Sequence, residues 1–223
     1  MKKIESTSEC YFLRRIDLYE NESIFSYIYR MSLANHYDKF SDFKSVLNDF
    51  VTNNNYSNKP EREKTYEILS QAFGYSNSIL WNASPRRFES VFNFSRNKNR
   101  HMNWWIEINP RKNNRLFFRD PSQSAYCPLC LHDHPHYQLI WDLQCVNICC
   151  EHKILLLNCC PNCQSNLNER DIIHCMCPYC FHKLSESKTE KQTINQNSID
   201  TQIALIHIIN NDTNRNTAFD FPV

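Results

Sequence analysis

The sequence predicts a mainly α-helical N-terminal domain with a helix-turn-helix, followed by a small cysteine-rich α+β domain. Three observations lead to this prediction: apolar residues recur at helical spacing before residue 85, eleven of the twelve cysteines lie between Cys127 and Cys180, and Gly74 is the single glycine. Phosphate loops, dinucleotide-binding turns and nucleophile elbows each need several glycines. The composition therefore argues against nucleotide, nicotinamide and serine-hydrolase sites.

Two helices are expected first in the chain. Residues 21–37 carry apolar side chains at helical spacing, with Asn21 or Ser23 as the expected N-cap. Residues 41–51 show a clearer apolar stripe, and Ser41 is the expected cap of that helix.

The helix-turn-helix is expected next. A third helix should begin at Pro60 and stop at Gly74, and a short helix should begin at Ser76 or Asn77 and end before Pro85. The short helix contains neither Lys nor Arg. The motif can therefore serve contacts with protein as well as contacts with DNA.

Residues 86–120 form a basic, aromatic segment, which we call the basic neck. Between residues 86 and 119, nine basic residues oppose two acidic ones, a formal charge of +7, with Phe and Trp side chains interleaved. Cations beside aromatic rings can hold phosphates and stack on bases, although a solvated face over an aromatic core has the same composition. The expected nucleic-acid contacts are Arg86, Arg87, Arg96, Lys98, Arg100, Arg111, Lys112, Arg115 and Arg119.

Four paired metal-ligand motifs follow the neck, each with two residues between its ligands. This spacing lets one tight turn direct both ligands to one ion. Taken in sequence order, the pairs predict one zinc held by Cys127, Cys130, Cys149 and His152 and a second held by Cys160, Cys163, Cys177 and Cys180. Protein atoms would fill every ligand position, so we expect two structural Zn²⁺ ions, a zinc-stabilised α+β domain and no catalytic site.

Other uses of the cysteines fit less well. Cross-braced RING and LIM modules place a Cys pair two or three residues after the His, whereas seven residues follow His152 here. No His is followed by x-Glu, as a zinc deaminase requires. No apolar run has the length of a signal peptide or a membrane span, so we expect a cytoplasmic bacterial protein in which disulfides are disfavoured.

The zinc segment is acidic. Residues 121–184 contain three basic and five acidic residues, and zinc sites with three and four thiolates add −1 and −2, so the formal charge is about −5. An acidic segment is a poor primary binder of phosphates. We expect it to dock proteins beside the basic neck.

Several residues of this segment lie outside the ligand set. We expect Cys145, Cys150, Cys159 and Cys175 to be small buried residues, although Cys150 and Cys159 adjoin ligands and could replace them. His132, His134 and His136 indicate a solvated turn. Trp141 and the apolar residues 154–157 are expected to pack between the two zinc lobes.

The end of the chain should contain a polar linker at residues 185–200 and one apolar helix at residues 201–210. The expected domains are therefore residues 1–85 (helical), 86–120 (basic neck), 121–184 (zinc) and 185–223 (linker and C-terminal helix).

The chain resembles the TniQ family over about residues 16–184. The N-terminal motif is Tyr19-Glu-Asn-Glu-Ser23, followed by Arg30 and Ala34-Asn35. The zinc segment carries Tyr126-Cys-Pro-Leu-Cys-Leu131, Trp141, Cys149-x-x-His152, Leu155-Leu-Leu157, Cys160-Pro-Asn-Cys163 and Cys177-x-x-Cys180.

The resemblance implies a non-enzymatic target selector of DNA transposition with a helix-turn-helix domain and a double zinc-ribbon domain. Such proteins recruit an AAA+ transposition ATPase, either from a DNA attachment site or from a CRISPR effector. The short form looks more like the TniQ of CRISPR-associated transposons, so the implied partners are the ATPase, DNA and a CRISPR effector or its guide RNA, with no membrane.

Two other functions remain open. A stand-alone, sequence-specific DNA-binding regulator would use the helix-turn-helix with structural zinc. An enzyme would need the unassigned cysteines for thiol chemistry, but none has a recognisable partner in the sequence.

Overall fold

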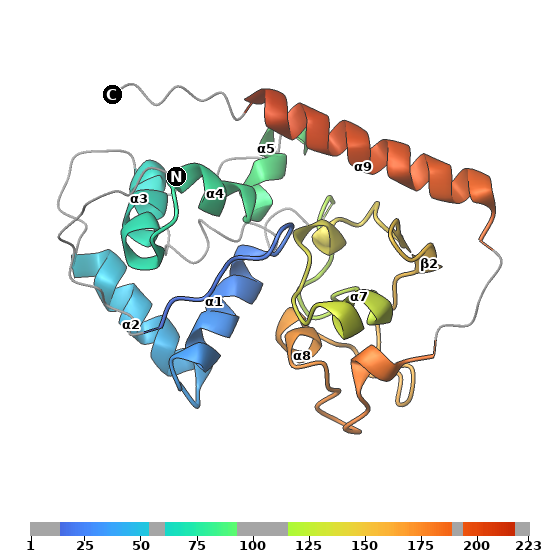
Figure 1. The fold of residues 1–223 in the computed structure, drawn as a ribbon, viewed down its shortest axis with the longest axis horizontal. Coiled ribbons are helices and arrows are strands. Elements are labelled where there is room, and N and C mark those ends of the chain that lie inside the picture. The colour runs from blue at the N-terminus through green and yellow to red at the C-terminus, as the bar shows by residue number, and fades with distance from the viewer. Residues whose placement is uncertain (1–13, 54–60, 93–115, 189–193, 217–223) are drawn as a thin grey trace.

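The computed structural model describes residues 14–53, 61–92, 116–188 and 194–216 (Figure 1). Over these residues the protein is predominantly helical, with one small antiparallel sheet. The N-terminal elements are α1 (Ile24–Ala34), α2 (Phe40–Asn53), α3 (Glu61–Phe73), α4 (Asn77–Asn82), the 3₁₀ helix η1 (Pro85–Phe88) and α5 (Glu89–Phe92).

The cysteine-rich part consists of short elements joined by turns. The two strands pair with Ile148 opposite Leu155 and Cys149 opposite Ile154. The elements are α7 (Pro128–Asp133), η3 (Leu139–Asp142), β1 (Ile148–Cys149), β2 (Ile154–Leu155), α8 (Glu169–Ile173) and η4 (Leu184–Glu186). Because this part has so little regular structure, it needs cross-links other than backbone ladders.

Two of the expected helix starts are confirmed and one is wrong. Ser23 caps α1 by accepting a 3.0 Å hydrogen bond from the backbone N–H of Ser26, and Ser76 caps α4. Ser41 caps nothing, because α2 already begins at Phe40 and Ser41 lies in its first turn. The expected start at Pro60 lies outside the described residues, and α3 continues from Glu61.

Gly74 ends α3 in the left-handed conformation, with φ of 75° and its N–H bonded to the carbonyl of Ser70 at 2.8 Å. This is the usual role of glycine after the last helical residue. Helices α3 and α4 pack on each other across this turn. The helix-turn-helix assignment itself stays a prediction.

We expect Gly74→Ala to lower the free energy of unfolding by about 1 kcal/mol, because a side chain is strained at positive φ. The added Cβ would also lie 2.5 Å from Arg15 Nη1, a flexible group that can move away. Urea unfolding measures the loss. Gln71→Ala, at an exposed position of α3, is the matched control and should change stability by less than about 0.5 kcal/mol.

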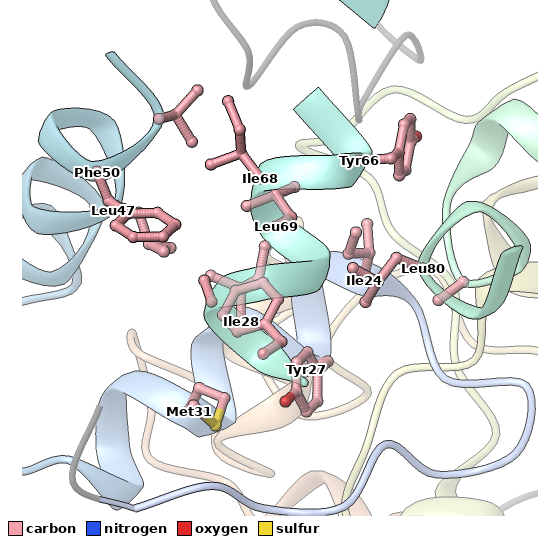
Figure 2. Packing of buried hydrophobic residues seen from close by; sticks show 14 of the residues in the cluster. Ile24, Tyr27, Ile28, Met31, Leu47, Phe50, Tyr66, Ile68, Leu69 and Leu80 are labelled. Atoms are coloured by element: carbon pink, nitrogen blue, oxygen red, sulfur yellow. The ribbon is translucent and has the colours of Figure 1, made fainter. Parts of the chain in front are cut away.

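The N-terminal core lies between α1, α2, α3 and α4 (Figure 2). Ile28, Leu47 and Leu69 each contribute a fully buried side chain from a different helix, and Leu80 of α4 closes one side. The apolar spacing that predicts these helices therefore also marks the faces that they bury.

A second core joins the cysteine-rich part to α1. It contains Trp141 and the buried cysteines of both ligand sets, together with Tyr29 of α1. Ile154, Leu156 and Leu157 pack against it, but Leu155 is 39% exposed because alternate residues of a strand face opposite sides. The expected packing of this apolar run is thus wrong for Leu155.

Helix α9 (Gln196–Asn216) is longer than expected and begins inside the expected linker. Ile199, Gln202 and Ile209 are buried along one face, and the helix packs against α5 and η1 (Figure 1). Ile209 joins Phe88, Phe118 and residues of the cysteine-rich part in a third core. This core combines three of the expected domains, and the domain boundaries stay predictions.

The motif around Glu22 joins α1 to the cysteine-rich part. Glu22 pairs as an isolated β-bridge with Gln138, the Ser23 N–H donates to the Tyr137 carbonyl at 2.9 Å, and the Ser26 hydroxyl accepts from the Tyr137 N–H at 3.1 Å. The Ser23 hydroxyl also donates to the buried carboxylate of Glu169 on α8. The N-terminal motif therefore fixes the two halves of the protein to each other.

Candidate metal centres

The first ligand cluster combines residues from α7, β1 and the turn after β1. The ligand atoms of Cys127, Cys130, Cys149 and His152 all lie within 4.8 Å of one another. His152 Nδ1 is 3.5, 3.3 and 3.7 Å from the sulfur atoms of Cys127, Cys130 and Cys149. Tetrahedral zinc, with bonds of about 2.3 Å to sulfur and 2.0 Å to nitrogen, separates its ligands by roughly these distances.

The second cluster contains four cysteines from two turns. Cys160, Cys163, Cys177 and Cys180 also lie within 4.8 Å of one another. The Cys160–Cys180 and Cys163–Cys177 sulfur distances are both 3.6 Å. Each cluster takes its ligands from two consecutive pairs, so the structure brings the residues together in the sequential arrangement and not in a cross-braced one.

Three of the four ligand pairs share one turn geometry. The residue after the second ligand has positive φ, 55° at Lys153, 60° at Gln164 and 58° at Phe181. Its N–H donates to the carbonyl of the first ligand at 2.8, 2.8 and 3.0 Å. The first pair differs, because Cys127 is the N-cap of α7 and Cys130 lies within that helix. Non-glycine residues at positive φ are costly, which indicates that the clusters hold these turns in place.

The electrostatics of the second cluster favour a bound cation. Burial raises the pKa of the Cys160 thiol to about 12, whereas its hydrogen bond with Ser165 lowers the pKa of the Cys163 thiol to about 6. Four sulfur atoms this close together can all be thiolates only when a cation lies among them. The soft sulfur donors and the four-ligand sets fit zinc.

Asp133 supports the first cluster from outside. Its Oδ2 lies 3.4 Å from His152 Nε2, on the opposite side of the imidazole from the sulfur atoms. A carboxylate at this position fixes the orientation and tautomer of a metal-binding histidine. Asp133 was not among the expected site residues, because its place in a His-Asp-His run indicated a solvated turn, and the sequence shows no sign of its contact with His152.

We expect Asp133→Asn to weaken zinc binding at the first site by about 10–100-fold while leaving the second site unchanged. Competition with a colorimetric zinc chelator measures both sites on the full chain. His132→Asn is the matched control, since His132 is an exposed neighbour that bonds to Asp133 but not to His152. Equal loss of zinc in the two variants would contradict the role of Asp133.

Two expectations about nearby residues are wrong. Cys145 is exposed and Cys150, Cys159 and Cys175 are partly exposed, so none of the four is a buried packing residue. They lie in or beside turns, where the backbone follows the surface. His136 is buried and stacks on Tyr19 at 4.9 Å, because the contacts of Tyr137 and Gln138 hold it against the start of α1, whereas His132 and His134 are exposed as expected.

The described part of the basic neck places three of the expected nucleic-acid contacts inside the fold. Arg86 is buried beside Glu89, and Arg87 donates to Asn82 and Asn210. Arg119 donates to the carbonyls of Trp141 and Val146 and to Asn147. The remaining six lie outside the described residues: Arg96, Lys98, Arg100, Arg111, Lys112 and Arg115.

A helical N-terminal half bound to a turn-rich half with two four-ligand clusters defines a class of small zinc-stabilised helical proteins. A model of the TniQ family matches residues 13–156. The chain therefore belongs to the TniQ family, whose members are non-catalytic transposition factors that work with an ATPase and DNA. The first cluster lies within the matched residues, and the second lies beyond them.

A search of curated proteins finds no match. Within the described ranges, none of the helices has both the length and the apolar character needed to cross a membrane.

Proposed function

We propose that the protein is a non-enzymatic target-selection adaptor that links a nucleic-acid or CRISPR targeting complex to the AAA+ transposition ATPase. The observation that carries the proposal is family membership together with two four-ligand clusters in one rigidly joined molecule. A four-ligand set filled by protein atoms serves structure, because it has no open position for a substrate. The chain's role is then to present surfaces.

Structural zinc at both clusters is part of this proposal. The ligands would be Cys127, Cys130, Cys149 and His152 at the first site and Cys160, Cys163, Cys177 and Cys180 at the second. Zinc would replace the extended core that short elements cannot supply. The exposed surface of the cysteine-rich part would stay rigid enough to recognise a partner.

An exposed aromatic pair supports a protein contact on the second cluster. Tyr179 and Phe181 are 68% and 73% exposed, and Phe181 also has positive φ. Aromatic side chains held outside a core are typical of the centre of a protein interface. The acidic charge of this part of the chain disfavours nucleic acid as its main ligand.

The nucleic-acid contact is assigned to the six neck residues between Arg96 and Arg115. Arg86, Arg87 and Arg119 are engaged within the fold and would contribute less. A neck that binds phosphates should lose affinity steeply as salt increases, and a flat salt response would remove the neck from the proposal.

Co-purification with the AAA+ ATPase of the same transposon tests the adaptor function. We expect association with the ATPase, and we expect Phe181→Ala to weaken it while Leu155→Ala, at an exposed position of the first cluster's hairpin, leaves it unchanged. No association, with or without nucleic acid, would contradict the proposal. Specific binding to duplex DNA at physiological salt without a partner would favour the alternative, a stand-alone DNA-binding regulator.

A further inference from the structure

A cavity of about 210 Å³ lies where the two halves of the protein meet α9. Its walls come from the loop before α1, from η1, from η3, from the region of β1 and from α9. Cavities at such junctions are common ligand sites, because several elements can direct side chains to one point. Neither the metal clusters nor the proposed nucleic-acid contacts use this cavity.

Arg87 brings a positive charge to the cavity wall. Its guanidinium donates to Asn210 Oδ1 at 3.0 Å and to the Asn82 carbonyl at 3.4 Å, while its buried Nε has no hydrogen-bond partner. Burial lowers the pKa of Arg87, and no carboxylate among the described residues pairs with it. By contrast, Arg30 has Glu22 and Arg86 has Glu89.

A buried cation with neutral partners is unfavourable unless an anion completes the site. The position can therefore be explained by a ligand that supplies one negative charge. A guanidinium binds a planar carboxylate through two parallel hydrogen bonds, and the unpartnered Nε is one of the donors available for this.

The rest of the wall selects the kind of anion. The apolar side chains are Leu139, Ile140, Trp141, Val146, Ile148 and Ile206, and the amides are Asn21, Gln138 and Asn210. The volume is below the roughly 300–1,000 Å³ of pockets that enclose a drug-sized ligand, so it suits one side chain. Glu151 and the ligand Cys149 also line the cavity, and their negative charge disfavours a nucleic-acid backbone.

We propose that this cavity binds the side chain of an aspartate or glutamate from an acidic peptide segment of a protein partner, with Arg87 as the residue that pairs with the carboxylate. The apolar wall would cover the methylene groups of that side chain, and the amides would bond to its backbone. This inference does not depend on the identity of the ATPase or of the targeting complex.

The Arg87 Nε–H resonance of the full-length, zinc-loaded protein tests the proposal by ¹H–¹⁵N NMR. The probe is N-acetyl-glutamate N-methylamide, and the matched control is the neutral glutamine analogue. We expect a saturable shift with the glutamate probe and at least about tenfold weaker binding of the glutamine probe, because only the carboxylate carries charge. No saturable shift with the glutamate probe would overturn the proposal.

Inorganic phosphate separates the two sources of anion. If phosphate at equal ionic strength shifts the Arg87 resonance with higher affinity than the glutamate probe, the site accepts a phosphate and the assignment to an acidic peptide is overturned. Weaker binding of phosphate supports the assignment.

Two variants locate the binding. Arg87→Gln removes the charge, but it also alters the bond to Asn210 that helps to hold α9, so loss of binding in this variant needs a second test. Ile206→Phe fills the cavity from α9 and keeps Arg87, and binding monitored at other cavity resonances should be lost in both variants. Arg170→Gln, at an exposed arginine of α8, is the control and should bind normally. Unchanged binding in Ile206→Phe would overturn the location.

Discussion

Replacing Cys160 by serine should release one of two bound zinc ions and unfold the segment from Cys159 to Leu184. Cys160 is fully buried, and its sulfur lies in the second cluster and in the core that joins the cysteine-rich part to α1. A structural zinc supplies on the order of 10–16 kcal/mol to the folding of an isolated finger, which far exceeds what the short elements here can provide. Loss of one ligand should therefore cost more than the segment can tolerate.

Cys159→Ser is the matched control for this prediction. Cys159 is the adjacent residue, and its sulfur bonds to Gln164 Oε1 at 3.4 Å instead of joining the ligand cluster. Native mass spectrometry should show two zinc ions in the control and one in Cys160→Ser, and limited proteolysis should cut the Cys160→Ser protein after residue 159. A folded Cys160→Ser protein with two zinc ions would show that Cys159 can act as the ligand instead.

Replacing Arg30 by methionine is expected to lower the free energy of unfolding by about 3–5 kcal/mol. Arg30 donates from Nε to Glu22 Oε1 at 2.7 Å and from Nη2 to Glu22 Oε2 at 2.6 Å, and the Glu22 side chain is completely buried. The substitution leaves a buried carboxylate without its counter-ion, which is the costly way to break such a pair.

A double variant separates this cost from the value of the pair itself. In Glu22→Gln/Arg30→Met no buried charge remains unpaired, so its loss of stability should be smaller than that of Arg30→Met alone. Arg170→Met, at an exposed arginine, should change stability by less than about 0.5 kcal/mol. Urea unfolding of the zinc-loaded proteins measures all three. A loss below 1 kcal/mol in Arg30→Met would contradict the structural role of the motif.

The sequence was informative wherever a local rule acts. The two-residue ligand spacing predicts which atoms meet, since a turn of that length needs no distant contact, and Ser23 and Ser76 cap their helices by bonding within one turn. Gly74 similarly marks the end of α3. These features depend on residues a few positions apart in the chain.

The sequence was less informative where distant segments decide the environment. His136 is buried because the start of α1 pairs with the residues after it, and no local pattern indicates that pairing. Arg86 belongs to a run that reads as a basic surface, yet the fold buries it beside Glu89. Composition gives the charge of a segment, and only packing determines which charges face the solvent.

Metal content measured by native mass spectrometry on the full 223-residue chain tests the central claim most directly. The account predicts two zinc ions per chain under native conditions and none after denaturation in acid. Removal of both ions by a chelator should also abolish the cooperative unfolding of the cysteine-rich part. One zinc ion per chain, or a metal-free chain that stays folded from Cys127 to Cys180, would contradict the account.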